Sequence, residues 1–123
     1  MSINQHSDQD GILPNELIVG PFVLNQAQRW VMRDGQRVKL TRTETQILYY
    51  LMRHAGTLVP MRTLLEEVWG YTYFSPTDGF TVRTYIFRLR RKLGDDVNVA
   101  HHLQTVIGQG FVLQAEATRS PLE

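Results

Sequence analysis

The chain of 123 residues contains no cysteine. It can therefore hold no disulfide, thiolate nucleophile or cysteine-based zinc site, which excludes several small secreted and metal-stabilised folds. Its longest apolar runs, such as residues 47–52, fall far short of the ~20 residues that a membrane-spanning helix needs. The polar N-terminus also lacks the apolar core of a signal peptide. We therefore expect one cytoplasmic domain with a single hydrophobic core and no membrane partner.

The sequence also has little net charge, with 13 basic against 12 acidic residues and a formal charge of +1. This total gives no compositional sign of a nucleic-acid binder. The charge is unevenly placed, however, because residues 79–94 contain no acidic residue and five basic ones: Arg83, Arg88, Arg90, Arg91 and Lys92. A near-neutral chain thus contains a basic segment.

Polar residues without an apolar period occupy positions 1–16, which we interpret as a flexible linker or arm. We expect the folded domain over residues 17–115 and a C-terminal tail over residues 116–123. Short β-rich runs separated by turn residues predict a small antiparallel sheet from residues 17–19, 22–24, 29–32 and 37–40. Asp34-Gly35 favours a type I′ hairpin turn, in which both central residues need positive φ.

Two helices are predicted next, from apolar residues at helical spacing. The first follows a capping box of Thr41 and Glu44 and continues to Gly56. Its apolar stripe consists of Ile47, Leu48, Leu51 and Ala55. The second has Pro60 in its first turn and ends before Gly70. Its stripe consists of Leu64, Leu65, Val68 and Trp69.

A third helix and a hairpin complete the predicted domain. Asp78 is expected to be the N-cap of the helix, and Gly94 ends it. The apolar residues of this helix are Val82, Ile86, Leu89 and Leu93. Residues 103–107 and 111–113 flank Gly108-Gln109-Gly110 and favour a C-terminal hairpin. The order of elements predicts an α+β fold.

The third helix carries the chemistry that stands out. At about 100° per residue, the face opposite its apolar stripe presents Thr84, Phe87, Arg88 and Arg91, with Arg83 and Arg90 on one flank. Arginine bonds guanine edges or phosphate, and an α-helix fits the major groove of DNA. The alternative for this helix alone is an ordinary solvated face. Its position between a shorter helix and a hairpin favours a helix-turn-helix variant with a wing.

Several motifs along the chain resemble a known family when they are taken in order. They are Gly20-Pro21-Phe22-Val23-Leu24, Asp34-Gly35, Leu40-Thr41 with Glu44, Leu64-Leu65-x-x-Val68-Trp69-Gly70, Thr81-Val82, Ile86-x-x-Leu89-Arg90-Arg91-Lys92-Leu93 and Thr105-Val106-x-Gly108-x-Gly110-Phe111. From about residue 17 to residue 113 the chain resembles the OmpR/PhoB-type winged-helix domain of two-component response regulators. The resemblance implies a winged helix-turn-helix with a four-stranded N-terminal antiparallel sheet, three helices and a C-terminal β-hairpin wing.

The resemblance also implies roles for individual residues in binding double-stranded DNA. It places base contacts at Thr84 and Arg88, phosphate or base contacts at Arg83, Arg90 and Arg91, a backbone contact at the Trp69 indole, and wing contacts at Thr105 and Gln109. Trp69 has a plain alternative as a core residue, and Thr105 and Gln109 as ordinary hairpin residues. The family further implies head-to-tail dimers on direct repeats, a contact of the 70–77 loop with RNA polymerase, and an upstream receiver domain and histidine kinase.

The chain departs from the family pattern at four positions. Pro60-Met61 replaces a Ser-Arg pair, Ile107 replaces a wing arginine, Phe80 replaces a frequent arginine, and Phe87 replaces a basic residue. Each change removes a cationic contact, so we expect weaker or more salt-sensitive binding, or a preference shifted towards thymine methyl groups. A receiver domain cannot be placed before Leu17. The resemblance therefore leaves open an effector half of a longer regulator and a stand-alone regulator.

Two other functions compete with DNA binding. An enzyme is not expected, because the histidines at positions 6, 54, 101 and 102 have no cysteine, nucleophile motif or His-x-x-x-His partner. For the same reason we expect no metal and no cofactor. A winged-helix module that binds protein is the second alternative, since the wing arginine is missing and Phe87 is expected to be exposed.

Overall fold

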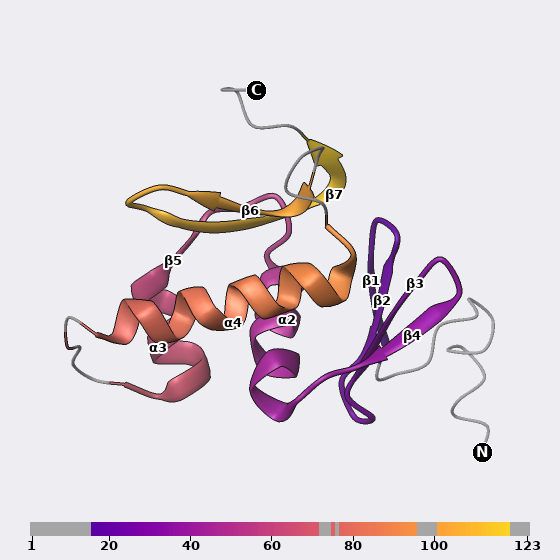
Figure 1. Cartoon of the computed structure of the whole chain (residues 1–123), viewed down its shortest axis with the longest axis horizontal. Coiled ribbons are helices and arrows are strands. Elements are labelled where there is room, and N and C mark those ends of the chain that lie inside the picture. Colours follow the sequence, from indigo (N-terminus) through magenta and orange to yellow (C-terminus); the bar gives the residue numbers. More distant parts are fainter. Residues whose placement is uncertain (1–15, 72–74, 76, 96–100, 119–123) are drawn as a thin grey trace, which may run out of the picture.

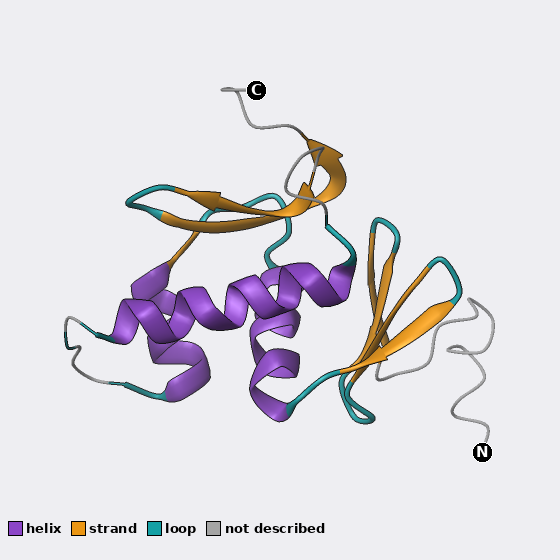
Figure 2. Ribbon diagram, in the orientation of Figure 1, coloured by secondary structure: helices purple, strands orange, loops and turns teal. Residues whose placement is uncertain are grey.

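A computed structural model describes residues 16–71, 75, 77–95 and 101–118. Two sheets and three helices make up this part of the chain (Figures 1 and 2). The elements are β1 (Glu16–Val19), β2 (Phe22–Asn25), β3 (Trp30–Arg33), β4 (Gln36–Lys39), α2 (Arg42–Arg53), β5 (Val59–Pro60), α3 (Met61–Trp69), α4 (Asp78–Leu93), β6 (His101–Val106) and β7 (Gly110–Thr118). The predicted α+β winged-helix fold, with its N-terminal sheet, three helices and C-terminal hairpin, is confirmed.

The N-terminal sheet is an antiparallel meander in the order β1-β2-β3-β4. Its last turn has positive φ at both Asp34 (52°) and Gly35 (81°), as the predicted type I′ turn requires. The β1–β2 turn contains Gly20, where an added Cβ would collide with the backbone carbonyl of Ala115 in β7. The two sheets therefore contact each other through this turn.

Helix α2 begins with the predicted capping box. The Thr41 hydroxyl accepts a hydrogen bond from the Glu44 amide (3.1 Å), and the Glu44 carboxylate accepts one from the Thr41 amide (2.9 Å). The predicted end was wrong, because the helix stops at Arg53 and Ala55 lies beyond it as an exposed residue. The Gly56 amide donates to the Leu113 carbonyl (2.8 Å), which ties the loop after α2 to β7.

A short strand that was not predicted comes before α3. Val59 and Pro60 form β5 and pair with Phe111 and Gly110 of β7, so the hairpin belongs to a three-stranded sheet in the order β5-β7-β6. Pro60 is consequently the N-cap of α3 and not, as predicted, a residue of its first turn. Gly70 ends α3 in the left-handed conformation (φ 71°), as predicted.

Helix α4 crosses the molecule between the β6–β7 hairpin and the other two helices (Figure 1). Its predicted apolar stripe is buried at every position: Val82, Ile86, Leu89 and Leu93. The expected N-cap was wrong, because Thr77 holds that position and Asp78 is the first helical residue. The Asp78 carboxylate instead accepts a hydrogen bond from the Ser75 amide (2.7 Å). Gly94 ends the helix with φ 77°, as predicted.

The C-terminal hairpin is longer than its sequence pattern indicated, since β7 continues to Thr118, past residue 115. Its inner side chains join those of the N-terminal sheet and all three helices in one core. The largest fully buried side chains are Phe22, Phe111, Leu24, Ile47, Leu48, Leu51, Leu64, Ile86, Leu89, Leu93, Leu103 and Leu113. This core fixes both α4 and the hairpin, leaving the outer face of α4 to solvent.

Candidate nucleic-acid interface

The outer face of α4 brings five of the predicted site residues together. Arg83, Thr84, Phe87, Arg88 and Arg91 are all exposed. They project from the side opposite the buried stripe, because that stripe repeats every three or four residues and the exposed positions fall between its members. We call these five residues together with Phe80 the α4 face. It contains three guanidinium groups and no carboxylate.

Each arginine of the α4 face lies over an aromatic ring. Arg83 lies 5.1 Å from the ring centroid of Phe80, Arg91 lies 5.9 Å from that of Phe87, and Arg88 lies 5.5 Å from that of Tyr85. Such stacking restricts the rotamers of a long side chain while leaving the edge of the guanidinium open to acceptors. The arginines are thus partly ordered before a ligand arrives.

Thr84 lies among these arginines, where a hydroxyl can donate or accept a hydrogen bond. Its Oγ1 donates to the Phe80 carbonyl one turn earlier (2.9 Å). In this rotamer the lone pairs of the hydroxyl oxygen are available, so Thr84 can accept a hydrogen bond from a base amino group.

The other two basic residues of the segment are held by the fold. The Arg90 guanidinium donates from Nε to the Leu103 carbonyl (2.8 Å) and from a terminal nitrogen to the Thr105 hydroxyl, which ties α4 to β6. Burial lowers the pKa of Arg90, and the nearby Asp95 carboxylate acts in the opposite direction. A DNA contact by Arg90 stays a prediction, but its donors already have partners within the protein.

Lys92 reaches back to the start of α2. Its ammonium group donates to the Glu44 carboxylate (2.6 Å) and to the Lys39 carbonyl (3.1 Å). Burial by itself would raise the pKa of Glu44, but the hydrogen bonds and charge of Lys92, together with those from Thr41, bring it below its usual 4.5. Glu44 is almost completely buried, so this ion pair holds the C-terminal end of α4 to α2.

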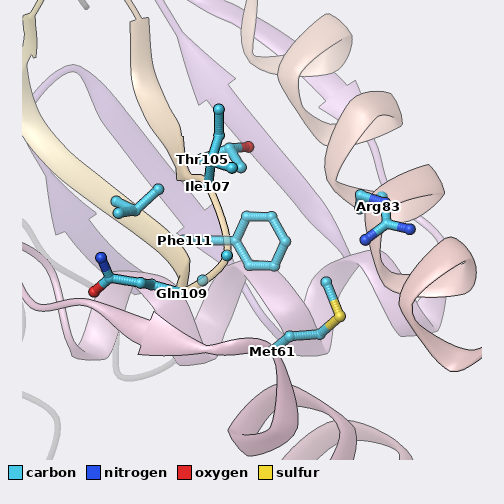
Figure 3. Close-up of a pocket in the computed structure, with 9 residues that line it drawn as sticks. Met61, Arg83, Thr105, Ile107, Gln109 and Phe111 are labelled. Carbon is cyan, nitrogen blue, oxygen red and sulfur yellow. The ribbon is translucent and has the colours of Figure 1, made fainter. Parts of the chain in front are cut away.

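A cleft of about 390 Å³ separates the N-terminal half of α4 from the hairpin. Figure 3 shows Met61 and Arg83 reaching from their helices towards Phe111, with Thr105, Ile107 and Gln109 on the hairpin. Thr105 and Gln109 are exposed, as wing contacts would have to be. Ile107 at the hairpin tip is 89% exposed. The cleft therefore lies between the two elements that the sequence assigned to DNA.

Trp69 is half-buried at the end of α3 and packs edge-on against Tyr85 of α4 (centroids 5.6 Å apart). This packing fits the plain alternative of a residue that joins two helices, and a DNA contact by its indole stays a prediction. Most of the loop expected to contact RNA polymerase, including residues 72–74, lies outside the described residues. Tyr71, at its start, is 38% exposed.

Asp95 and His102 form a buried polar pair that has a structural task. The Asp95 carboxylate accepts hydrogen bonds from the backbone amides of His102 (3.1 Å) and Leu103 (2.9 Å), and lies 3.3 Å from His102 Nδ1. Within the described residues, no three His, Asp or Glu side chains gather in a way that could hold a metal ion. No helix in that same part of the chain is long and apolar enough to cross a membrane.

Comparisons with known proteins agree with this geometry. The family model "Transcriptional regulatory protein, C terminal" matches residues 35–113. The transcriptional regulatory protein KdpE of Mycobacterium tuberculosis is 42% identical over 94 residues, which cover 76% of this chain and 41% of KdpE. The chain thus spans about two fifths of the length of this curated relative.

Solved structures give the same result. The DNA-binding domain of Klebsiella pneumoniae RstA, in complex with the RstA box, aligns with a TM-score of 0.72 at 27% identity, over 82% of this chain and 98% of that one. The DNA-binding domain of CpxR from E. coli aligns with a TM-score of 0.69 at 34% identity, over the same shares. DrrB of Thermotoga maritima, an OmpR/PhoB homologue, aligns with a TM-score of 0.68 at 26% identity, over 89% of this chain and 48% of that one. The chain therefore belongs to the family of transcriptional regulatory protein C-terminal domains, which are winged-helix domains of the OmpR/PhoB type.

Proposed function

We propose that this chain binds double-stranded DNA at specific sequences and regulates transcription as the output domain of a response regulator. The observation that carries the proposal is the α4 face, on which three exposed arginines surround Thr84 without any carboxylate. Arginine donates two parallel hydrogen bonds to guanine, and threonine bonds to several bases. A helix with this face can enter the major groove with its apolar stripe still in the core.

The cleft beside α4 suits the sugar-phosphate backbone. A DNA strand that leaves the major groove at α4 would pass between Arg83 and the hairpin, where the Thr105 hydroxyl and the Gln109 amide are exposed. Thr105 already accepts a hydrogen bond from Arg90, so its own O–H is directed outward to donate to a phosphate oxygen. These contacts would set the register of the helix without reading sequence.

Partners beyond DNA are proposed on the family resemblance. They are a second copy bound head-to-tail on a direct repeat, RNA polymerase at the loop of residues 70–77, and an upstream receiver domain controlled by a histidine kinase. The exposed Tyr71 supports an apolar contact at the loop. The part of KdpE that this chain does not cover is long enough to include a receiver domain.

The test is selection of bound duplexes from a randomised pool, followed by a salt titration of binding to the selected sequence. We expect a direct repeat to be enriched and the logarithm of the affinity to fall linearly with the logarithm of salt concentration. Arg88→Ala should reduce or remove the enrichment. Arg53→Ala is the matched control, because it removes one exposed arginine from the end of α2, where that residue bonds only Tyr49.

A protein-binding module is the second candidate, favoured by the exposed Phe80, Phe87 and Ile107. Salt separates the two functions, because apolar contact with a protein does not weaken as salt rises. Equal enrichment with Arg88→Ala and the wild type, or no binding at low salt, would refute DNA reading by the α4 face and favour a protein partner.

A further inference from the structure

Two large apolar side chains stand in the middle of the basic α4 face. Phe80 is 66% exposed and Phe87 is 55% exposed. Exposing two phenyl rings to water is unfavourable, and the fold gains nothing from it since the core is closed by other residues. Both rings instead lie beneath arginines, at 5.1 Å for Arg83 and 5.9 Å for Arg91. A ligand for this surface must accept phenyl and guanidinium groups together.

The spacing of the two rings matches the repeat of DNA. Phe80 and Phe87 are seven residues apart, which brings them to within about 20° of one another around α4 and about 10.5 Å apart along its axis. Stacked base pairs repeat every 3.4 Å or so, and about three steps therefore cover the same length. A helix lying along the major groove would present one ring to a base pair and the other ring to a base pair about three steps away.

The major groove contains an apolar group that suits a phenyl ring. The C5-methyl group of thymine projects into the groove, and phenylalanine is one of the side chains that contact it. Neighbouring phosphates and guanine acceptors would then meet Arg83 and Arg91, which already lie over the same rings. The absence of any carboxylate from residues 79–94 makes the surface complementary to a polyanion.

We propose that Phe80 and Phe87 are specificity residues that read two thymine methyl groups about three base pairs apart. This inference rests on the proposed DNA binding and adds to it a base preference at two positions. Such a preference needs no cation, so it also explains what the α4 face gains from phenylalanine at these positions.

The experiment uses the duplex selected above and replaces each thymine, one at a time, by deoxyuridine. This change removes only the methyl group and keeps the base-pairing and hydrogen-bonding pattern. We expect the dissociation constant to rise about fourfold at each of two positions about three base pairs apart, since each loses one buried methyl group. Phe87→Ala should abolish the sensitivity at one position, and Phe80→Ala at the other.

Ile18→Ala is the matched control, because Ile18 is 47% exposed on β1, away from α4. It should leave both sensitivities unchanged. Sequence-specific binding with no deoxyuridine effect at any position would overturn the methyl-reading inference and leave the proposed function intact. An effect that persisted in both phenylalanine variants would overturn the methyl-reading inference in the same way. A chain that selects no duplex at all would overturn both, and would assign the two rings to a protein partner.

Discussion

Replacing Arg90 and replacing its neighbour Arg91 should have opposite consequences. Both changes remove one positive charge from the same turn of α4. The Arg90 side chain is directed at β6 and donates to Leu103 and Thr105, whereas Arg91 is exposed and stacked on Phe87. We therefore expect Arg90→Ala to weaken the fold and Arg91→Ala to weaken DNA binding.

The expected size of each effect follows from the contacts. A hydrogen bond to a charged group contributes about 1.5–3 kcal/mol. Because Arg90 is only partly buried, we expect Arg90→Ala to lower the free energy of unfolding by about 2 kcal/mol. At the urea sensitivity of a domain of this size, the unfolding midpoint should fall by about 1 M. Arg91→Ala should change the free energy of unfolding by less than about 0.5 kcal/mol.

DNA binding should show the reverse pattern. Loss of a phosphate contact reduces the slope of log affinity against log salt by about 0.9, and we expect this change for Arg91→Ala alone. Urea unfolding followed by tryptophan fluorescence, together with anisotropy titrations at several salt concentrations, measures both quantities on the same samples. The reasoning is refuted if Arg90→Ala unfolds at the wild-type urea concentration and lowers the salt slope.

Three further changes test other parts of the structure. Glu44→Gln should lower the free energy of unfolding by about 1–3 kcal/mol at pH 7. Because the folded-state pKa of Glu44 lies below 4.5, this stabilisation is complete above that pH and is lost as pH falls through the folded value, so wild type and variant should converge in urea melts near pH 3. Gly110→Ala should cost more than about 2 kcal/mol, since a Cβ there meets the β5 backbone, whereas Gly108→Ala, with open space around it, should cost about 1 kcal/mol for its positive φ; equal melting temperatures would contradict this. Ile107→Arg should steepen the salt slope by about 0.9 without moving the urea midpoint, because the side chain is 89% exposed, and an unchanged slope would place the hairpin tip away from phosphate.

The features that could be predicted from sequence are those fixed by nearby residues. The capping box of Thr41 and Glu44, the Asp34-Gly35 turn and the helix end at Gly94 each depend on a few adjacent positions, and all three are present. Strand β5 could not be anticipated in this way. Val59 is a strand residue only because Phe111, far along the chain, pairs with it.

The candidate site shows the same division. A helical wheel puts Arg83 and Arg90 on the same flank of α4 and cannot separate them. In the structure Arg90 lies against β6 and is bonded to it, while Arg83 faces the cleft near the hairpin tip. Phe80 was not predicted as a site residue, because an apolar side chain next to a buried stripe is as readily a core residue as an exposed one. Its spacing from Phe87 was available in the sequence.

The polar links that hold α4 to the rest of the fold gather at one end. Lys92 bonds Glu44, the Leu93 carbonyl accepts from Arg33, and Asp95 accepts from the backbone of β6, all within one turn of Gly94. A helix held in this way behaves as a lever with its pivot at the C-terminal end. A tilt of about 5° would move the Phe80 end by almost 2 Å and the Arg91 end by only about 0.3 Å. Bases read by Arg91 would thus be specified strictly, whereas the Phe80 end can follow local variation in groove width.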